Sequence, residues 1–170
     1  MPYVAPEVLL GQKFTKAADI YSFGVIMSEM STGQRPFDGQ EFDHKLAIKI
    51  CKGLRPEFAS GTPDCYIELA NQCMNLDPQK RPTANDLWNI LEKWIINIES
   101  SNSTNESLLP KESSLSSDEQ LSILKIKKQF LEADEVIKSL PIPKHSDEMY
   151  TSKIIKTKLI SKAIKGVYFN

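Results

Sequence analysis

The segment from residue 16 to residue 30 is apolar on nearly every side, and this constrains the fold more than any other feature. Val25 and Ile26 place apolar surface on faces away from the main stripe. Thr15 can cap the N-terminus of a helix here, and Gly33 can end it just beyond. A helix that is apolar all round belongs at the centre of a core. The main stripe runs through Ile20, Phe23, Met27 and Met30.

The rest of the first 98 residues shows the same helical periodicity. Residues 42–51 read as a weaker helix with one apolar face. Thr62 and Pro63 look like an N-cap followed by proline at the first helical position. Residues 83–86 are a close variant of the capping box, which marks the start of a last amphipathic helix. No run alternates with period two, so the sequence predicts an all-α unit of about four main helices.

Composition changes near residue 99. Residues 1–98 carry 10 basic and 12 acidic side chains, and residues 99–170 carry 11 and 10. Eight of the eighteen residues from 100 to 117 are serine. Such a stretch buries too little apolar surface to offset its ordering entropy. We therefore divide the chain into a folded unit at 1–98 and a tail at 99–170 that begins with a Ser-rich linker.

The tail contains one segment with helical order, at residues 117–140. It opens on a capping-box pattern, S-D-E-Q. Its apolar residues repeat at 3-4-3-4-3 spacing over less than three heptads, which is short for a coiled coil. Three interpretations therefore stay open: the helix pairs with a partner helix, it docks on residues 1–98, or it is a frayed helix in solvent. These residues are Ile123, Ile126, Phe130, Ala133, Ile137 and Leu140.

The last twenty residues form a basic end to the tail. Residues 151–170 hold five lysines and no acid. We expect a solvated, disordered segment here. Contact with an anionic surface is the alternative.

Composition also excludes several classes of protein. The net charge of -1 gives no global field that would recruit nucleic acid or a membrane. No apolar run approaches the roughly 20 residues of a membrane span, and the first residues lack the features of a signal peptide. Three cysteines without CxxC spacing fit reduced thiols in a cytosolic or nuclear protein, and we expect a cytoplasmic location. His44 and His145 are isolated, so a metal site is not expected.

Four short motifs occur in order and at regular spacing: A-P-E at 5–7, D-I-Y-S-F-G-V at 19–25, T-G-Q-R-P-F at 32–37 and C-M-N-L-D-P-Q-K-R-P-T at 73–83. Together they resemble the C-terminal lobe of a eukaryotic protein kinase from the A-P-E motif onward. Tyr21, in place of the common Trp, and a G-x-R-P segment at 53–56 are similar to the tyrosine-kinase-like branch, whose members mostly phosphorylate Ser and Thr. The resemblance implies the helical half of that lobe at 1–98, followed by a largely disordered tail with one amphipathic helix.

The resemblance assigns roles to five residues. It implies that Glu7 and Arg81 form a buried ion pair, and an Arg fork does suit a carboxylate; two exposed charges at turns are the alternative. It implies that Asp19 is a buried acceptor of backbone N–H groups, although the residue alone would read as a first-turn Asp favoured by the helix dipole. It places Tyr3 and Pro6 beside the substrate, with simple packing as the alternative.

Phosphoryl transfer in this family needs a Gly-rich loop, a strand Lys, a catalytic-loop Asp and the metal-binding Asp of D-F-G. None of these motifs occurs in the 170 residues. No catalytic, cofactor-binding or metal residue is therefore assigned, and ATP and Mg remain cofactors of the parent family. We expect part of a Ser/Thr kinase that is inactive alone; the alternatives are a non-catalytic kinase-like binding or adaptor module, and an unrelated helical scaffold. The expected partner is a protein substrate or another protein.

The motifs also imply a problem of stability. The family's core has further elements beside the central helix. Without them Val25 and Ile26 would be partly exposed, and Asp19 would lack its donors. We therefore expect the isolated chain to be marginally stable, molten or dependent on a partner.

Overall fold

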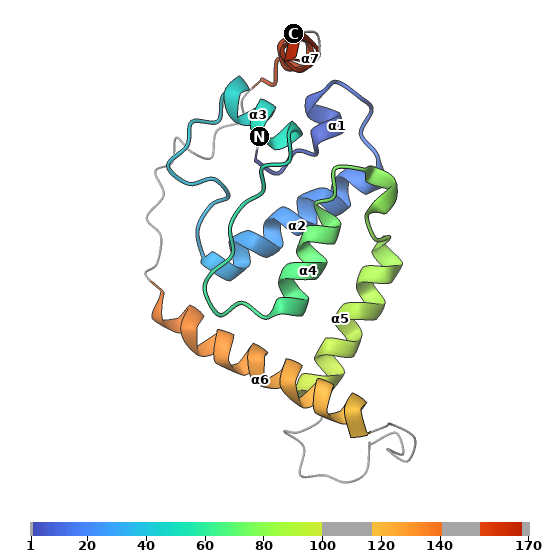
Figure 1. The fold of residues 1–170 in the computed structure, drawn as a ribbon, viewed down its shortest axis with the longest axis vertical. Coiled ribbons are helices and arrows are strands. Elements are labelled where there is room, and N and C mark those ends of the chain that lie inside the picture. The colour runs from blue at the N-terminus through green and yellow to red at the C-terminus, as the bar shows by residue number, and fades with distance from the viewer. Residues whose placement is uncertain (1, 100–116, 141–153, 168–170) are drawn as a thin grey trace.

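The computed structural model describes residues 2–99, 117–140 and 154–167, and all regular structure in these ranges is helical (Figure 1). The expected all-α class is therefore confirmed for this part of the chain. The predicted linker at 100–117 lies almost wholly outside the described residues. The helices are α1 (Pro6–Leu9), α2 (Lys16–Thr32), α3 (His44–Cys51), α4 (Asp64–Cys73), the 3-10 turn η1 (Pro78–Lys80), α5 (Ala84–Glu99), α6 (Ser117–Ser139) and α7 (Thr157–Val167).

Helix α2 forms the centre of the core and packs along α4. The two helices approach closely at Gly24. A Cβ atom on Gly24 would lie 2.7 Å from the Cβ of Cys73 and 2.8 Å from the carbonyl oxygen of Ala70. Only glycine fits this crossing. A second glycine, Gly33, ends α2 in the left-handed region, at φ 65°.

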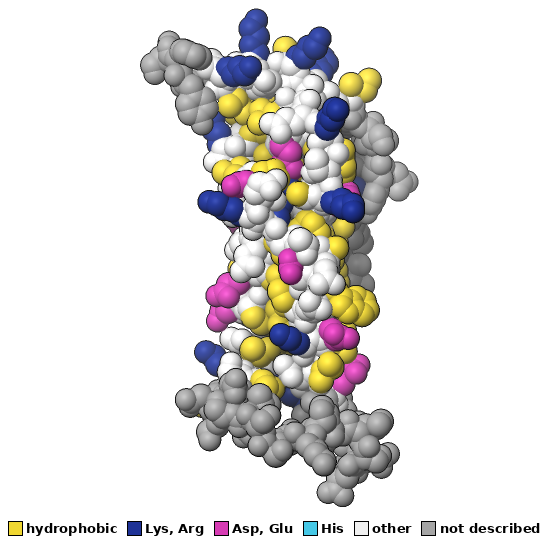
Figure 2. All heavy atoms as spheres, turned by 90° about the vertical axis from the view of Figure 1, so that its right-hand side faces the viewer, with side chains coloured by type: hydrophobic (Ala, Val, Ile, Leu, Met, Phe, Trp, Pro, Cys, Tyr) yellow, Lys and Arg dark blue, Asp and Glu magenta, His cyan; other side chains and the backbone are white. Residues whose placement is uncertain are grey.

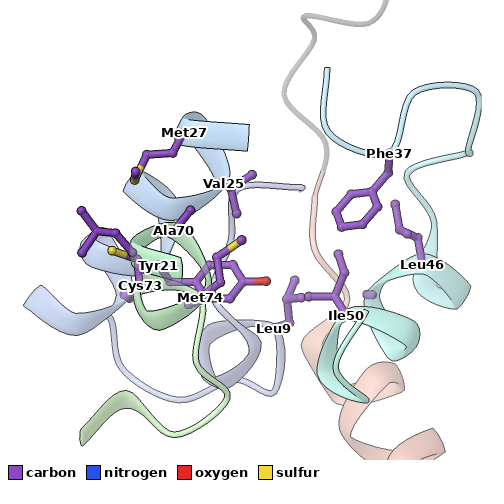
Figure 3. Packing of buried hydrophobic residues seen from close by; sticks show 14 of the residues in the cluster. Leu9, Tyr21, Val25, Met27, Phe37, Leu46, Ile50, Ala70, Cys73 and Met74 are labelled. Carbon is purple, nitrogen blue, oxygen red and sulfur yellow. The ribbon is translucent and has the colours of Figure 1, made fainter. Parts of the chain in front are cut away.

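The core around α2 is closed more completely than the sequence indicates. Val25 was expected to be partly exposed, and this expectation is wrong, because Val25 is fully buried. It belongs to the buried cluster that also contains Leu9, Ile50 and Met74 (Figure 3). Ile26, in contrast, is 42% exposed, as expected for a core that lacks the family's further elements.

The helix starts follow local side-chain chemistry. The predicted capping box is confirmed, because the Thr83 N–H donates to Asp86 Oδ2 at 2.9 Å and the Asp86 N–H donates to Thr83 Oγ1 at 3.2 Å. Asp43 caps α3 by accepting the N–H groups of Lys45 and Leu46, so α3 begins later than residue 42.

The predicted N-cap at Thr62, with Pro63 as the first helical residue, is wrong by one position. Helix α4 begins at Asp64, and Pro63 occupies the N-cap position. The Thr62 hydroxyl does not cap the helix, because it donates backwards to the Ala59 carbonyl at 2.7 Å.

Helix α6 matches the predicted segment and docks on the first unit. It crosses the end of α5 (Figure 1). An aromatic cluster joins them, in which the Phe130 ring lies 5.4 Å from Trp94 and 6.4 Å from Tyr66 between centroids. Of the three alternatives for this segment, docking on residues 1–98 is the one observed.

A second tail helix, α7, was not predicted. It lies against α1 and α3 (Figure 1). Ile160 is 1% exposed, and Ile155 and Ile164 pack on the same buried cluster. An isolated helix of this length is marginal in water, so this packing is what stabilises α7. Residues 154–167 are therefore not the solvated tail expected from their charge. No helix in the described ranges is long and apolar enough to cross a membrane.

If α7 is an integral part of the fold, Ile160→Ala will destabilise the chain by about 2–5 kcal/mol, because it leaves a cavity against α1 and α3. Urea unfolding followed by circular dichroism measures this. The matched control is Leu159→Ala, since Leu159 is 55% exposed and its truncation should change stability by less than about 0.5 kcal/mol. Equal effects of the two variants would show that α7 does not pack as described.

Candidate functional site

The predicted ion pair between Glu7 and Arg81 is present and lies in the interior of the structure. Arg81 Nη1 donates to Glu7 Oε1 at 2.7 Å, and Arg81 Nη2 donates to Glu7 Oε2 at 2.8 Å. The Arg81 side chain is fully buried and that of Glu7 is 8% exposed. This is a bidentate, charge-assisted contact between residues 74 positions apart.

Arg81 also binds two backbone carbonyls. Its Nη1 donates to the Ala17 oxygen at 2.8 Å, and its Nε donates to the Asn75 oxygen at 2.8 Å. One guanidinium thus connects α1, the first turn of α2 and the loop before η1. These hydrogen bonds give the N–H donors of the buried guanidinium oxygen acceptors, and a charge in the interior requires such partners.

Local backbone structure positions both Glu7 and Arg81. Pro6 opens α1 and places Glu7 in its first turn. Arg81 follows η1 in extended conformation, and η1 itself starts where Asp77 accepts the Gln79 N–H at 3.0 Å.

The electrostatics of Glu7 favour its charged form. Burial acts to raise the pKa of the carboxyl group. Hydrogen bonds from Arg81 and from the backbone, together with the positive charge of Arg81, outweigh burial and hold the pKa below its usual 4.5.

A second contact, missed at the sequence level, surrounds Tyr21. The guanidinium carbons of Arg55 and Arg81 each lie 5.1 Å from the centre of the Tyr21 ring, a cation–π geometry. Arg55 is held in turn by the carbonyls of Met74 at 2.8 Å and Leu54 at 2.7 Å. The sequence signal was the joint presence of Tyr21 and the G-x-R-P segment, whose Arg and Tyr contact each other.

The Tyr21 hydroxyl has no hydrogen-bond partner among the described residues, although the side chain is fully buried. It points toward Leu9 (Figure 3). Burial raises the pKa of Tyr21 to about 12, against the opposing effect of the two arginine charges.

Tyr3 and Pro6 lie beside α2 and at the start of α1. The Tyr3 hydroxyl donates to Glu29 Oε2 at 2.7 Å, and the Ser22 hydroxyl donates to the Tyr3 carbonyl at 2.7 Å. Pro6 is buried. These contacts fix the segment that precedes α1, and a role in positioning a substrate stays a prediction.

The prediction for Asp19 needs correction, because Asp19 is exposed in the first turn of α2. No backbone N–H in the described ranges donates to its carboxylate. The lack of donors agrees with the expectation for a chain without the family's further elements, because no described element covers this side of α2. In this structure Asp19 therefore matches the simpler reading, an acid at a helix N-terminus.

The remaining reactive side chains in the described ranges are three cysteines and one histidine. The three cysteines are free thiols. Burial raises the pKa of Cys51 and of Cys73 to about 11 in each case, so both are protonated at neutral pH. His44 is exposed. No group of three or more His, Cys, Asp or Glu residues in the described ranges could hold a metal ion.

A comparison with known protein families gives a match over the first half of the chain, which contains the Glu7–Arg81 pair. The model of the protein tyrosine and serine/threonine kinases matches residues 1–91. The chain belongs to the protein kinase family. Helices α6 and α7 lie beyond the matched range.

Curated relatives cover the same half of the chain. A protein of Acanthamoeba polyphaga mimivirus, named as a serine/threonine-protein kinase/receptor, is 38% identical over 85 residues, which are 50% of this chain and 5% of the relative. Kinase drkB of Dictyostelium discoideum is 38% identical over 90 residues, 53% of this chain and 13% of its own length. Cyclic GMP-binding protein C of the same organism is 38% identical over 92 residues, 52% and 4%. The chain thus spans a small fraction of the relatives it matches.

The ion pair generates a stability prediction. Arg81→Met strands the Glu7 carboxylate in the interior and should cost about 3–5 kcal/mol, whereas Glu7→Leu combined with Arg81→Met should recover much of that loss. Chemical denaturation of the single and double variants measures the coupling. Additive losses in the double variant would contradict a direct buried pair.

The pH dependence of the same pair is a second readout. Because the folded pKa of Glu7 is lowered, its contribution is fully present above about pH 4.5 and is lost as the pH falls through the folded value. The stability difference between wild type and Glu7→Gln should therefore shrink on acidification.

For the Tyr21 hydroxyl we expect the opposite effect on stability, because its removal should not destabilise the chain. Tyr21→Phe should leave stability unchanged or raise it by about 0.5–1 kcal/mol, because the variant removes a buried hydroxyl that has no partner. Thermal unfolding measures this, and alkaline titration of tyrosine absorbance should lose one group with a pKa of about 12. Tyr66 is the internal control, since burial raises its pKa to about 12 as well and its hydroxyl donates to the Met27 carbonyl at 2.9 Å. A loss of stability in Tyr21→Phe comparable to that in Tyr66→Phe would refute the prediction.

Proposed function

We propose that this chain is part of a Ser/Thr protein kinase that transfers the γ-phosphate of ATP to Ser and Thr of protein substrates in cytoplasmic signalling. The observation that carries the proposal is the buried pair between Glu7 of A-P-E and Arg81 of R-P-T. It joins the first and last of the four motifs in one interior contact. The names of the relatives from mimivirus and Dictyostelium support the Ser/Thr type.

Within the family, we assign the chain to the tyrosine-kinase-like branch. Support comes from the contact of Arg55 with the ring of Tyr21. The two residues belong to the two features that distinguish that branch in the sequence. In this chain a cation–π contact therefore couples the two features.

Tyr3 and Pro6 are proposed to help position the protein substrate in the parent kinase. Both are held firmly, Tyr3 by Glu29 and Ser22 and Pro6 by burial at the start of α1. ATP and Mg would be bound by parts of the parent that carry the G-x-G-x-x-G, H-R-D and D-F-G motifs, because the 170 residues contain none of them.

A non-catalytic binding or adaptor module is the second candidate. The observation that favours it is the closed core. Helix α2 buries Val25 completely, and α6 and α7 pack over two ends of the family-matched unit. A unit closed in this way can present a surface without performing chemistry.

The 170-residue chain should show no transfer of phosphate from labelled ATP to casein, to a Ser/Thr peptide library or to itself, with signal equal to a protein-free blank. Mass spectrometry of the reaction detects any phosphorylated product. Sustained turnover by homogeneous chain would contradict the prediction.

The proposal for the parent has its own test. An in-frame genomic sequence upstream that encodes H-R-D and D-F-G should yield, when fused to this chain, an enzyme that phosphorylates Ser or Thr. Replacing the Asp of H-R-D by Asn in that fusion is the control and should abolish activity. A stable transcript that starts at Met1, with no such upstream sequence, would favour the adaptor instead.

A further inference from the structure

The end of the molecule formed by α7 is strongly basic. Lysine side chains gather there (Figure 2), whereas the acidic side chains visible in that view lie lower. Residues 154–167 contain four lysines and no acid. All four are exposed: Lys156, Lys158, Lys162 and Lys165.

Apolar side chains stand among these lysines. Ile154 is 94% exposed and Leu159 is 55% exposed. Ile160 and Ile164 turn the other side of α7 into the core, which leaves Lys158, Leu159 and Lys162 to face solvent. We call the outward set the α7 surface, made of Ile154, Lys156, Lys158, Leu159, Lys162 and Lys165.

Among the described residues, the helices packed against α7 leave this end of the molecule net positive. Helix α3 contributes exposed Lys45 and Lys49 and contains no acid. Asp43, at its N-terminus, caps α3, and the N–H groups of Leu46 and Lys45 lower its pKa, so it is ionised at neutral pH. It borders Ile154, Lys156 and Leu159 and offsets one of the six lysine charges of α3 and the α7 surface. The acid of α1, Glu7, is buried in its pair with Arg81 on the far side of that short helix from solvent. The positive charge at this end is therefore available to a partner.

We propose that the α7 surface binds the surface of an anionic membrane. The lysines would meet the negative headgroups, and Ile154 and Leu159 would enter the boundary between headgroups and acyl chains. An acidic protein would satisfy the lysines equally well. The Ile154 side chain, however, is 94% exposed, and a bilayer can surround such a protruding side chain on all sides. This favours a membrane as the partner.

Sedimentation of the full chain with lipid vesicles tests the proposal. The chain should bind vesicles in which phosphatidylserine replaces part of the phosphatidylcholine, and it should not bind vesicles of phosphatidylcholine alone. Binding should weaken as ionic strength rises. In the variant with Lys158→Gln, Lys162→Gln and Lys165→Gln, affinity should fall about fivefold per lysine, or on the order of a hundredfold in all.

A matched variant controls for net charge. Lys80→Gln, Lys93→Gln and Lys125→Gln change three exposed lysines on other elements and should leave binding unchanged. A separate variant, Ile154→Gln with Leu159→Gln, should weaken binding while preserving its dependence on salt, because the lysines remain. Circular dichroism melts verify that each variant folds like the wild type.

Three results would overturn the proposal. The first is equal binding to both kinds of vesicle, and the second is equal loss in the two triple-lysine variants. The third is binding of a soluble polyglutamate peptide at the α7 surface that is as tight as vesicle binding and insensitive to Ile154→Gln with Leu159→Gln. That last result would identify an acidic protein as the partner in place of a membrane.

Discussion

A single buried arginine organises this structure. The Arg81 guanidinium is fully enclosed, and a charge in that position is tolerated only when its donors and its charge are matched. Glu7, two backbone carbonyls and the ring of Tyr21 provide the match. Glu7 lies in α1, Ala17 and Tyr21 lie in α2, and Asn75 lies in the loop before η1, so satisfying one side chain fixes the relative position of these three parts. The hydrophobic cluster then fills the space that this arrangement defines.

The features that could be predicted from the sequence are those whose cause is local or whose residues belong to a motif. The apolar pattern of α2 predicted its place in the core, where Val25 and Met27 are buried, although Met30 of the predicted main stripe is 66% exposed. The Thr83 and Asp86 pattern predicted the start of α5. Glu7 and Arg81 are different, because nothing in their spacing along the chain brings them together. Only the resemblance joined them, and their bidentate geometry is what the structure adds.

Other features depend on which distant surface happens to be available, and sequence patterns do not carry that information. Asp19 was expected to be buried, but burial requires a neighbour over that side of α2. Helix α7 looked like a solvated basic segment, because its lysines dominate the composition. Its order comes from Ile160 and Ile164 meeting α1 and α3, a tertiary contact that overrides the low stability of a short isolated helix. The start of α4 was misplaced for a local reason, since the Thr62 hydroxyl turns back to Ala59.

The packing of α7 against α1 and α3 affects how the chain folds during synthesis. The helix that leaves the ribosome last among the described elements covers α1, which leaves it first. The apolar groups of α1 and α3 that Ile160 covers stay open until synthesis has passed residue 164, at a pace of about 5–20 residues per second. Closing a contact between such distant segments is also slow compared with forming the α2 and α4 pair. The nascent chain therefore passes through a period in which this face is a target for chaperones, and translation that stops before α7 leaves it uncovered.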